Sequence, residues 1–251
     1  MQDGPTFLTS QDISVVTTSK IESYGKIGTT YDGRNFIYVG FGGTTAFTPG
    51  QLVVAATAPT NSTGLALSAT QPFVTSLLAG SNSLYIVNGA TAVTQDLFAE
   101  GTIDILGLNG FASYKVRGNS AAAAGAVITV TLSEALRNTV ALTVANNTVN
   151  LSLSLHTGVI SSTTLSTNVG FTITPVPQSA AQSYFGWVQV RGRGFGINDA
   201  AAILAKDTVV QQSTTVAGAV VVMASASADP AGVVKETTAV SIGVPLYVNI
   251  Y

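Results

Sequence analysis

The side chains that could carry out acid–base, nucleophilic or metal chemistry are scarce in this sequence. The chain has one histidine, His156, and no cysteine. Most metal sites and the usual general base are therefore excluded, and a Ser-His-Asp triad would have to use His156. The alternation of "NLSLSLHTG" puts this residue on the serine-lined outward face of a predicted strand. We therefore interpret His156 as an exposed structural residue.

The acidic residues are the second candidates for catalysis, and Asp96, Glu100 and Asp104 are the closest cluster. Paired carboxylates hydrolyse glycosides, but such sites also need aromatic subsite residues, and this chain has one tryptophan. We interpret Asp96 and Glu100 as solvated loop charges and Asp104 as the outward residue of a strand. Asp199, next to Asn198, could bind a cation, but the Asp-x-Asp-x-Asp spacing of calcium loops is missing. The sequence predicts no catalytic residue, no cofactor site and no metal site, and we do not expect an enzyme.

The stretch "QSYFGWVQVRGRGFG", residues 182–196, combines glycines, two arginines and the only tryptophan. Its last three glycines alternate with other residues, so the dinucleotide fingerprint Gly-x-Gly-x-x-Gly is not met, and no Gly-Lys-Ser/Thr of a P-loop is present. RNA-binding Arg-Gly-Gly segments are repeated, disordered tracts, whereas this stretch follows an apolar strand. We interpret it as a strand with Phe185 and Trp187 on one face and Val188 and Val190 on the other. Its glycines would let the strand bend or bulge.

Arg191, Arg193 and Phe195 follow that apolar strand. At a corner of a sheet, the two guanidinium groups could contact acidic groups on a partner. The three residues are the predicted partner contacts of this chain.

Alternation of apolar and polar residues with period two dominates the sequence, as is typical of strands with one buried face. In "AVITVTLS", for example, Ile128, Val130 and Leu132 are expected to face the core. Further strands are predicted over residues 35–41, 51–57, 83–89, 102–108, 112–118, 150–156, 170–174, 186–192 and 245–251, and within the apolar segment 214–229.

Turn and helix signals complete the prediction of secondary structure. The Asp-Gly pair within 31–35 and the Asn-Gly pair within 108–111 favour tight hairpins. Short helices are predicted over 71–80 and over 198–206, the second with Asn198 as its N-cap. Many short strands with little helix predict an all-β fold, a β-sandwich or barrel of many short antiparallel strands.

The periodicity changes along the chain. Residues 1–95 have weak alternation and predict an extended arm or loosely packed lobe, whereas residues 96–251 alternate regularly and predict the β-sandwich or barrel domain.

The composition bears on the surface of the protein. Charged residues make up 9% of the 251 residues, against about 25% in ordinary globular domains, and the formal net charge is −2. Such a surface suits either a protein held in a fixed assembly or a monomer solubilised by hydroxyls and amides. It offers no basic footprint for DNA or RNA. The most apolar segment is shorter than the about 20 residues of a membrane helix, so no membrane association is predicted.

Three stretches resemble the head decoration, or cement, proteins of tailed bacteriophages. These are "EGTIDILGLNGFASYKVRGNSAAAAGAVITVTLSEAL" (100–136), the run ending in "FTITPVPQSAAQSYFGWVQVRG" (171–192), and the strand-rich tail. The shared pattern includes an Asn-Gly turn, a Tyr-x-Val strand, a "VTL" strand and the segment Tyr-Phe-Gly-Trp-Val-Gln at 184–189. The resemblance covers mainly residues 96–251. The "RGRGFG" after the tryptophan strand and the long N-terminal part depart from the pattern.

The resemblance implies a structural virion protein on the outer surface of an icosahedral capsid head. Such a protein would bind the major capsid protein, commonly as a homotrimer, and cement neighbouring subunits against the pressure of packaged DNA. It implies no active site. The alternative from a different class is a phage fibre or adhesin-type glycan-binding module, which would expose several aromatic side chains on loops. Here most Tyr and Phe residues fall within predicted strands.

Overall fold

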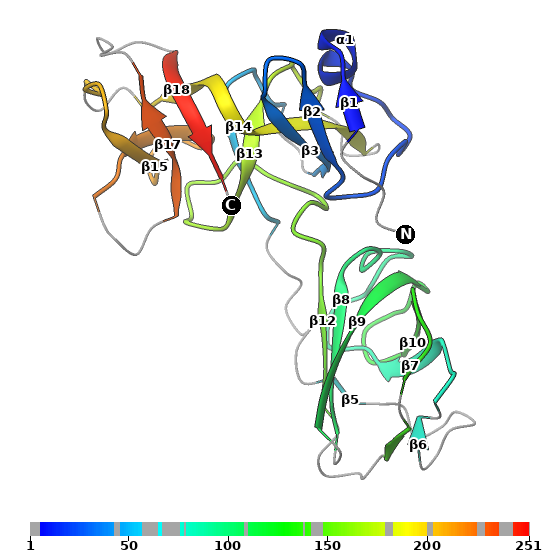
Figure 1. Ribbon diagram of the computed structural model, residues 1–251. Helices are drawn as coiled ribbons and strands as arrows, with labels where there is room; N and C mark the ends of the chain where they lie inside the picture. The colour runs from blue at the N-terminus through cyan, green and yellow to red at the C-terminus, as the bar shows by residue number, and fades with distance from the viewer. Residues whose placement is uncertain are drawn as a thin grey trace. The chain divides into compact units, whose positions relative to one another are not determined.

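The computed structural model describes residues 6–42, 46–56, 65–66, 76–77, 79–107, 110–137, 139–141, 148–178, 183–199, 203–224, 229–235 and 243–250. These residues form an almost entirely β structure, which confirms the predicted all-β class (Figure 1). In chain order the elements are β1 (Thr6–Leu8), α1 (Ser10–Ser14), β2 (Ile27–Thr30), β3 (Asn35–Phe41), β4 (Leu52–Val54), β5 (Leu65–Ala66), β6 (Ser76–Leu77), β7 (Ser83–Val87), β8 (Thr102–Gly107), β9 (Gly110–Asn119), β10 (Val127–Leu132), β11 (Val140–Ala141), β12 (Thr148–Ser152), β13 (Asn168–Thr172), β14 (Tyr184–Asn198), β15 (Val209–Gln212), β16 (Ala219–Val222), β17 (Pro230–Val234) and β18 (Val244–Asn249).

The chain forms two compact units, and the second is inserted into the first. Unit 1 comprises Met1–Ala56 and Leu155–Tyr251, and unit 2 comprises Thr57–Ser154. The predicted boundary near residue 95 lies inside unit 2, between β7 and β8. The division therefore differs from the predicted one, in which residues 1–95 and 96–251 were separate.

The N-terminal part of unit 1 is packed into its sheet, in contrast to the extended or loosely packed region that the sequence predicts. Strands β1 to β4 all belong to one large sheet, and Phe36 and Tyr38 of β3 are buried. The reason for the weak periodicity is visible in β3, where Tyr38, Val39, Gly40 and Phe41 are buried in succession. A strand covered on both faces reads as a continuous apolar run rather than as an alternation.

Unit 1 is organised around β14. The first part of this 15-residue strand pairs antiparallel with β3, and its second part pairs antiparallel with β18 and ends parallel to β16. The remaining pairings, β16 with β15, β15 with β17 and β17 with β18, close a five-stranded barrel. The predicted strand at 186–192 thus continues beyond the predicted corner and becomes a wall of the barrel.

Two apolar clusters lie on opposite faces of the first part of β14. Trp187 packs with Phe36 and Tyr38 in one cluster, and its ring meets the Tyr38 ring edge-on with 5.2 Å between centroids. Val188 belongs to the other cluster, beside Val39 of β3. This confirms the predicted faces of the strand for these two residues, as successive side chains of a strand point to opposite sides.

Unit 2 contains a six-stranded sheet in the order β5-β12-β8-β9-β10-β7, which curves around its own core (Figure 1). Ile128, Val130 and Leu132 of β10 are buried, as the alternation predicts. Hydrophobic burial of this kind, about 25 cal/mol for each Å² of apolar surface removed from water, is the main stabilising contribution in such a unit. The core residues come only from unit 2.

Neither of the two predicted helices is found among the described residues. Asn198 is the last residue of β14 and not a helix cap, and residues 203–206 contain no helix. Within 71–80, residues 76–77 form β6, and the described residues 79–80 are not helical, while 71–75 and 78 lie outside the described residues. The helix α1 was not predicted; it begins with a capping box in which Thr9 and Asp12 bond each other's backbone N–H. In the described part of the chain, no helix has the length and apolar character needed to cross a membrane.

Candidate partner-contact surface

Arg191, Arg193 and Phe195 lie in one row on the outer face of the barrel. All three side chains are exposed, while Gly192 and Gly196 between or after them are buried. Side chains two residues apart in a strand point to the same side, so the two guanidinium groups and the phenyl ring share one face. The predicted partner contacts are therefore brought together and are accessible.

Two further residues extend this row across the barrel. Tyr247 of β18 lies opposite Arg193 in the ladder, and it is exposed. Lys235, just after β17, has its Nζ 5.5 Å from the centroid of the Tyr247 ring, an arrangement of the cation–π type. We refer to Arg191, Arg193, Phe195, Lys235 and Tyr247 as the basic–aromatic face.

The orientation of this face depends on a β-bulge in β14. The register against β3 shifts between Gln189 and Arg191. Gln189 is 2% exposed, and its amide nitrogen Nε2 donates to the carbonyl oxygens of Arg191 at 3.2 Å and of Arg193 at 2.8 Å. A bulge re-aims the side chains that follow it. The buried amide of Gln189 therefore holds the backbone from which both arginines project.

Gly192 provides the backbone conformation that the bulge requires. Its φ is +99°, in the region that L side chains rarely adopt, and a Cβ at this position would lie 2.9 Å from Cγ of Arg34. The glycines of this stretch thus serve close packing of the chain, which agrees with the structural interpretation of "RGRGFG".

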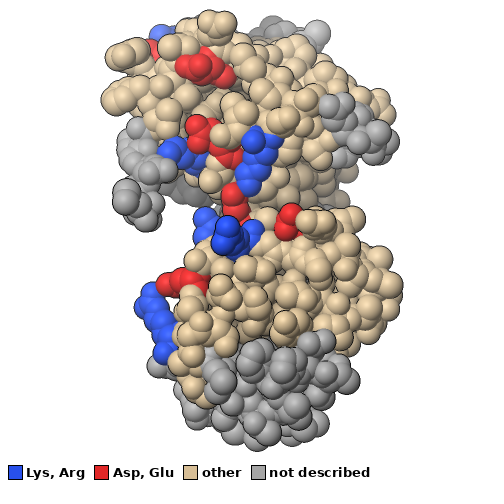
Figure 2. Space-filling view, turned by 90° about the vertical axis from the view of Figure 1, so that its right-hand side faces the viewer, with Lys and Arg blue, Asp and Glu red and all other residues tan. Residues whose placement is uncertain are grey.

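The basic–aromatic face carries positive charge. Arg34, which packs on Gly192, pairs with Asp32 at 2.7 Å, and a hydrogen bond from the Thr30 hydroxyl is the main cause that lowers the pKa of the Asp32 carboxyl. Among the described residues, Arg191 and Arg193 have no such ion pair. On the side of the molecule drawn in Figure 2, groups of Lys and Arg and of Asp and Glu lie close together within a mostly uncharged surface. Two exposed guanidinium groups without an ion pair in the described part of the chain are suited to binding carboxylates of another macromolecule.

His156 lies in a different setting from the predicted one. Strand β12 ends at Ser152, and His156 is in a turn of unit 1, half-buried, with its ring packed on Gly25. Burial lowers the pKa of the imidazole below its usual 6.5. The prediction of an exposed strand residue is wrong because the alternation of leucines continues past the point where the chain leaves unit 2 for unit 1.

The acidic residues that the sequence offers as candidates lie in separate places, and two of them accept hydrogen bonds within the fold. Asp96 and Glu100 both have positive φ, and Asp96 Oδ1 accepts the backbone N–H of Asn119 at 3.3 Å. Asp104 lies on β8 opposite Asn150 and is partly exposed. In unit 1, Asp199 accepts the Ser213 hydroxyl at 3.0 Å. A loop charge at 96 agrees with the prediction, although its role in holding the turn was not foreseen.

An exposed aromatic pair forms a second notable surface in unit 1. The rings of Phe7 and Tyr31 stack with 5.9 Å between centroids, and the two residues are 69% and 90% exposed. Beside them is a pocket of about 330 Å³, lined by Leu8, Thr9, Ser10, Thr30, Tyr31, Asp32 and Arg34. Sequence reasoning missed this pair because β1, which carries Phe7, pairs parallel with β2, and such a pairing leaves no local signal.

Comparisons with known proteins add no relative: no family model, no curated protein and no solved structure matches this chain.

Proposed function

We propose that this chain is a structural, non-enzymatic virion protein that binds the outer surface of an icosahedral phage capsid and cements neighbouring subunits against internal DNA pressure. The observation that carries the docking part of this proposal is the basic–aromatic face. The capsid as the partner comes from the sequence resemblance over residues 96–251. The two together favour attachment to the major capsid protein through unit 1.

The chemistry of the face supports docking onto a protein. Arginine and tyrosine are enriched among the residues that dominate binding energy at interfaces, and lysine at the rim steers association more than it adds affinity. Arg191, Arg193 and Tyr247 are therefore proposed as the central contacts, with Lys235 at the edge. The complementary surface on the capsid protein would be acidic.

We further propose a homotrimer, the assembly that the resemblance implies. Exposed apolar side chains of unit 1 such as Ile21 and Ile27, which are 64% and 50% exposed, would be covered by self-association. The molar mass from light scattering after size-exclusion chromatography tests this: three times the mass of one chain is expected, and a monomer at all concentrations would contradict the trimer.

The cementing role is tested on particles. Purified phage heads of the source virus would be analysed by quantitative mass spectrometry, and we expect many copies of this chain in a constant ratio to the major capsid protein. Heads with and without the chain would then be heated or transferred to low salt, and the heads that carry it should resist disruption longer. Coinciding disruption points would contradict cementing.

A second candidate function has a specific observation in its favour. The stacked Phe7 and Tyr31 border a pocket with Asp32 and Arg34, a combination of aromatic surface and polar groups that suits a sugar. This favours the glycan-binding module. Binding to a glycan array that is lost in the Tyr31→Ala variant, with Tyr85→Ala as a control in unit 2, would support it. Few copies on the particle would also favour host binding over cementing.

A further inference from the structure

Asn168 has a buried side-chain amide, and its oxygen has no hydrogen-bond partner among the described residues. The residue is 6% exposed and lies at the start of β13. Its Nδ2 donates to the backbone oxygen of Asp229 at 3.0 Å, which sets the orientation of the amide, because the reverse orientation would bring two oxygens together. Among the described residues, no donor reaches Asn168 Oδ1. Buried acceptors are nearly always paired, so this oxygen points to a missing ligand or water.

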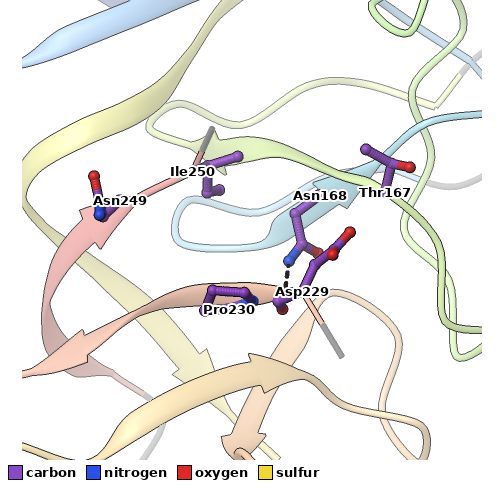
Figure 3. Close-up of a pocket in the computed structure, with 6 residues that line it drawn as sticks. All are labelled: Thr167, Asn168, Asp229, Pro230, Asn249 and Ile250. Carbon is purple, nitrogen blue, oxygen red and sulfur yellow. Dashed lines mark hydrogen bonds between the residues drawn. The ribbon is translucent and has the colours of Figure 1, made fainter. Parts of the chain in front are cut away.

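The amide lines a small pocket within unit 1. The pocket lies where β13 and β17 begin and β18 ends, and its volume is about 190 Å³. Its lining consists of Thr167, Asn168, Asp229, Pro230, Asn249 and Ile250. Figure 3 shows that the side-chain amide of Asn168 and the carboxylate of Asp229, from separate segments, lie next to each other. Two oxygen donors of different type thus meet at one place.

We propose that this pocket binds a calcium ion through Asn168 Oδ1 and the Asp229 carboxylate. Carboxylate and amide oxygens are hard ligands that suit Ca²⁺, and the flexible coordination of Ca²⁺ accepts an irregular donor set completed by waters. Mg²⁺ demands near-octahedral geometry and is the poorer fit. The volume exceeds the about 30 Å³ of one water but is below the 300–1,000 Å³ of usual small-molecule sites. An ion with part of its hydration shell fills such a space.

The calcium affinity of this pocket depends on its ligands. The described residues contain no group of three or more His, Cys, Asp or Glu side chains that could hold a metal, so Asp229 is the charged ligand that the site relies on. Arg191 lies opposite the lining residue Asn249 in the ladder, so a basic residue occupies the neighbouring strand position. We therefore expect a dissociation constant of roughly 10⁻⁴ to 10⁻³ M, the range of weak calcium modules.

The test is calcium-dependent thermal unfolding of the full chain. At a CaCl₂ concentration about ten times the dissociation constant, the unfolding temperature should rise by roughly 2–5 °C, because a ligand that binds only the folded state stabilises it. MgCl₂, and NaCl at the same ionic strength, should give a clearly smaller rise. An equal rise with NaCl, or no rise with calcium, would overturn the proposal and leave water as the partner of Asn168.

A matched pair of variants locates the site. Asp229→Asn keeps the backbone oxygen that Asn168 contacts but removes the charge, and we expect calcium affinity measured by titration calorimetry to fall at least about tenfold. Asp207→Asn removes an exposed carboxylate elsewhere in unit 1 and should leave the affinity unchanged. Unfolding temperatures without calcium show whether each variant is folded. Unchanged calcium affinity in a folded Asp229→Asn variant would overturn the site.

Discussion

At the scale of single residues, the side chain of Gln189 determines how the two arginines are presented. It is a buried amide whose Nε2 donates to two carbonyl oxygens on the far side of the bulge. A buried polar group of this kind stabilises the fold only while its partners are in place, and the partners in turn depend on it. The feature that gives the proposed interface its geometry is therefore not itself exposed.

Replacement of Gln189 by leucine tests this role. Gln189→Leu leaves the carbonyls of Arg191 and Arg193 without their donor, and we expect the free energy of unfolding to fall by about 1–3 kcal/mol. Urea unfolding followed by tryptophan fluorescence measures the change, since Trp187 lies on the same strand. The control Gln11→Leu, on the exposed side of α1, should change stability by less than about 0.5 kcal/mol. Equal effects of the two variants would argue against the buried amide as the support of the bulge.

His156 gives the chain a predictable response to acid. Burial lowers the imidazole pKa in the folded state, so the unfolded state, with a pKa near 6.5, binds a proton more readily. The folded state should therefore lose stability as the pH falls below about 6.5. The free energy of unfolding, measured by urea unfolding from pH 7 to 5, should lose this part of its pH dependence in His156→Gln. The same pH dependence in the variant and the parent chain would contradict the effect of burial.

At the scale of elements, strand β14 connects the parts of unit 1. It pairs with β3 through its first part and with β18 and β16 through its second part, and the bulge lies between the two. The five-stranded barrel closes only because the strand continues past the bulge. Gly192, whose φ is positive, follows directly after this bulge.

Substitution of two glycines with positive φ distinguishes the cost of backbone strain from the cost of a steric clash. Gly192→Ala and Gly33→Ala both place a methyl group on a left-handed backbone, at φ +99° and +82°. At Gly33 nothing lies within 4 Å, whereas at Gly192 the methyl group would also meet Arg34. We expect the free energy of unfolding to fall by about 1–2 kcal/mol in Gly33→Ala and by about 3 kcal/mol in Gly192→Ala, measured by chemical unfolding. A smaller loss at Gly192 than at Gly33 would show that the contact with Arg34 is easily relieved.

The strands could largely be predicted from the sequence, but their partners could not. Period-two alternation located β10 and β18, and the Asp-Gly pair located the hairpin between β2 and β3, because these signals are local. The local pattern of segment 198–206 predicts a helix, yet Asn198 pairs with Val220 of β16, so at this residue tertiary pairing overrides the local pattern.

The candidate site was predictable only in part. Arg191, Arg193 and Phe195 could be proposed from the sequence because they follow an apolar strand, at an expected corner of the sheet. Their alignment with Tyr247 depends on a register between strands about 50 residues apart, which no local pattern encodes. The pairing of Asn168 with Asp229 has the same origin, since three strand ends meet there only in the folded unit.

At the scale of the whole molecule, the insertion of unit 2 into unit 1 predicts separable folding. The core of unit 2 uses only its own residues, so a fragment of residues 57–154 should unfold cooperatively and show a β-type circular dichroism spectrum. A fragment without a cooperative transition would indicate that unit 2 depends on unit 1.

The proposed docking on a capsid is tested most directly by attachment of the full chain to emptied phage heads, measured by cosedimentation. The parent chain should bind, and binding should weaken as salt increases, because the proposed contacts are charged. The double variant Arg191→Gln/Arg193→Gln should bind about 10- to 100-fold more weakly, while Arg137→Gln, an exposed arginine of unit 2, should bind like the parent. Attachment of the folded double variant with parental affinity would contradict the account.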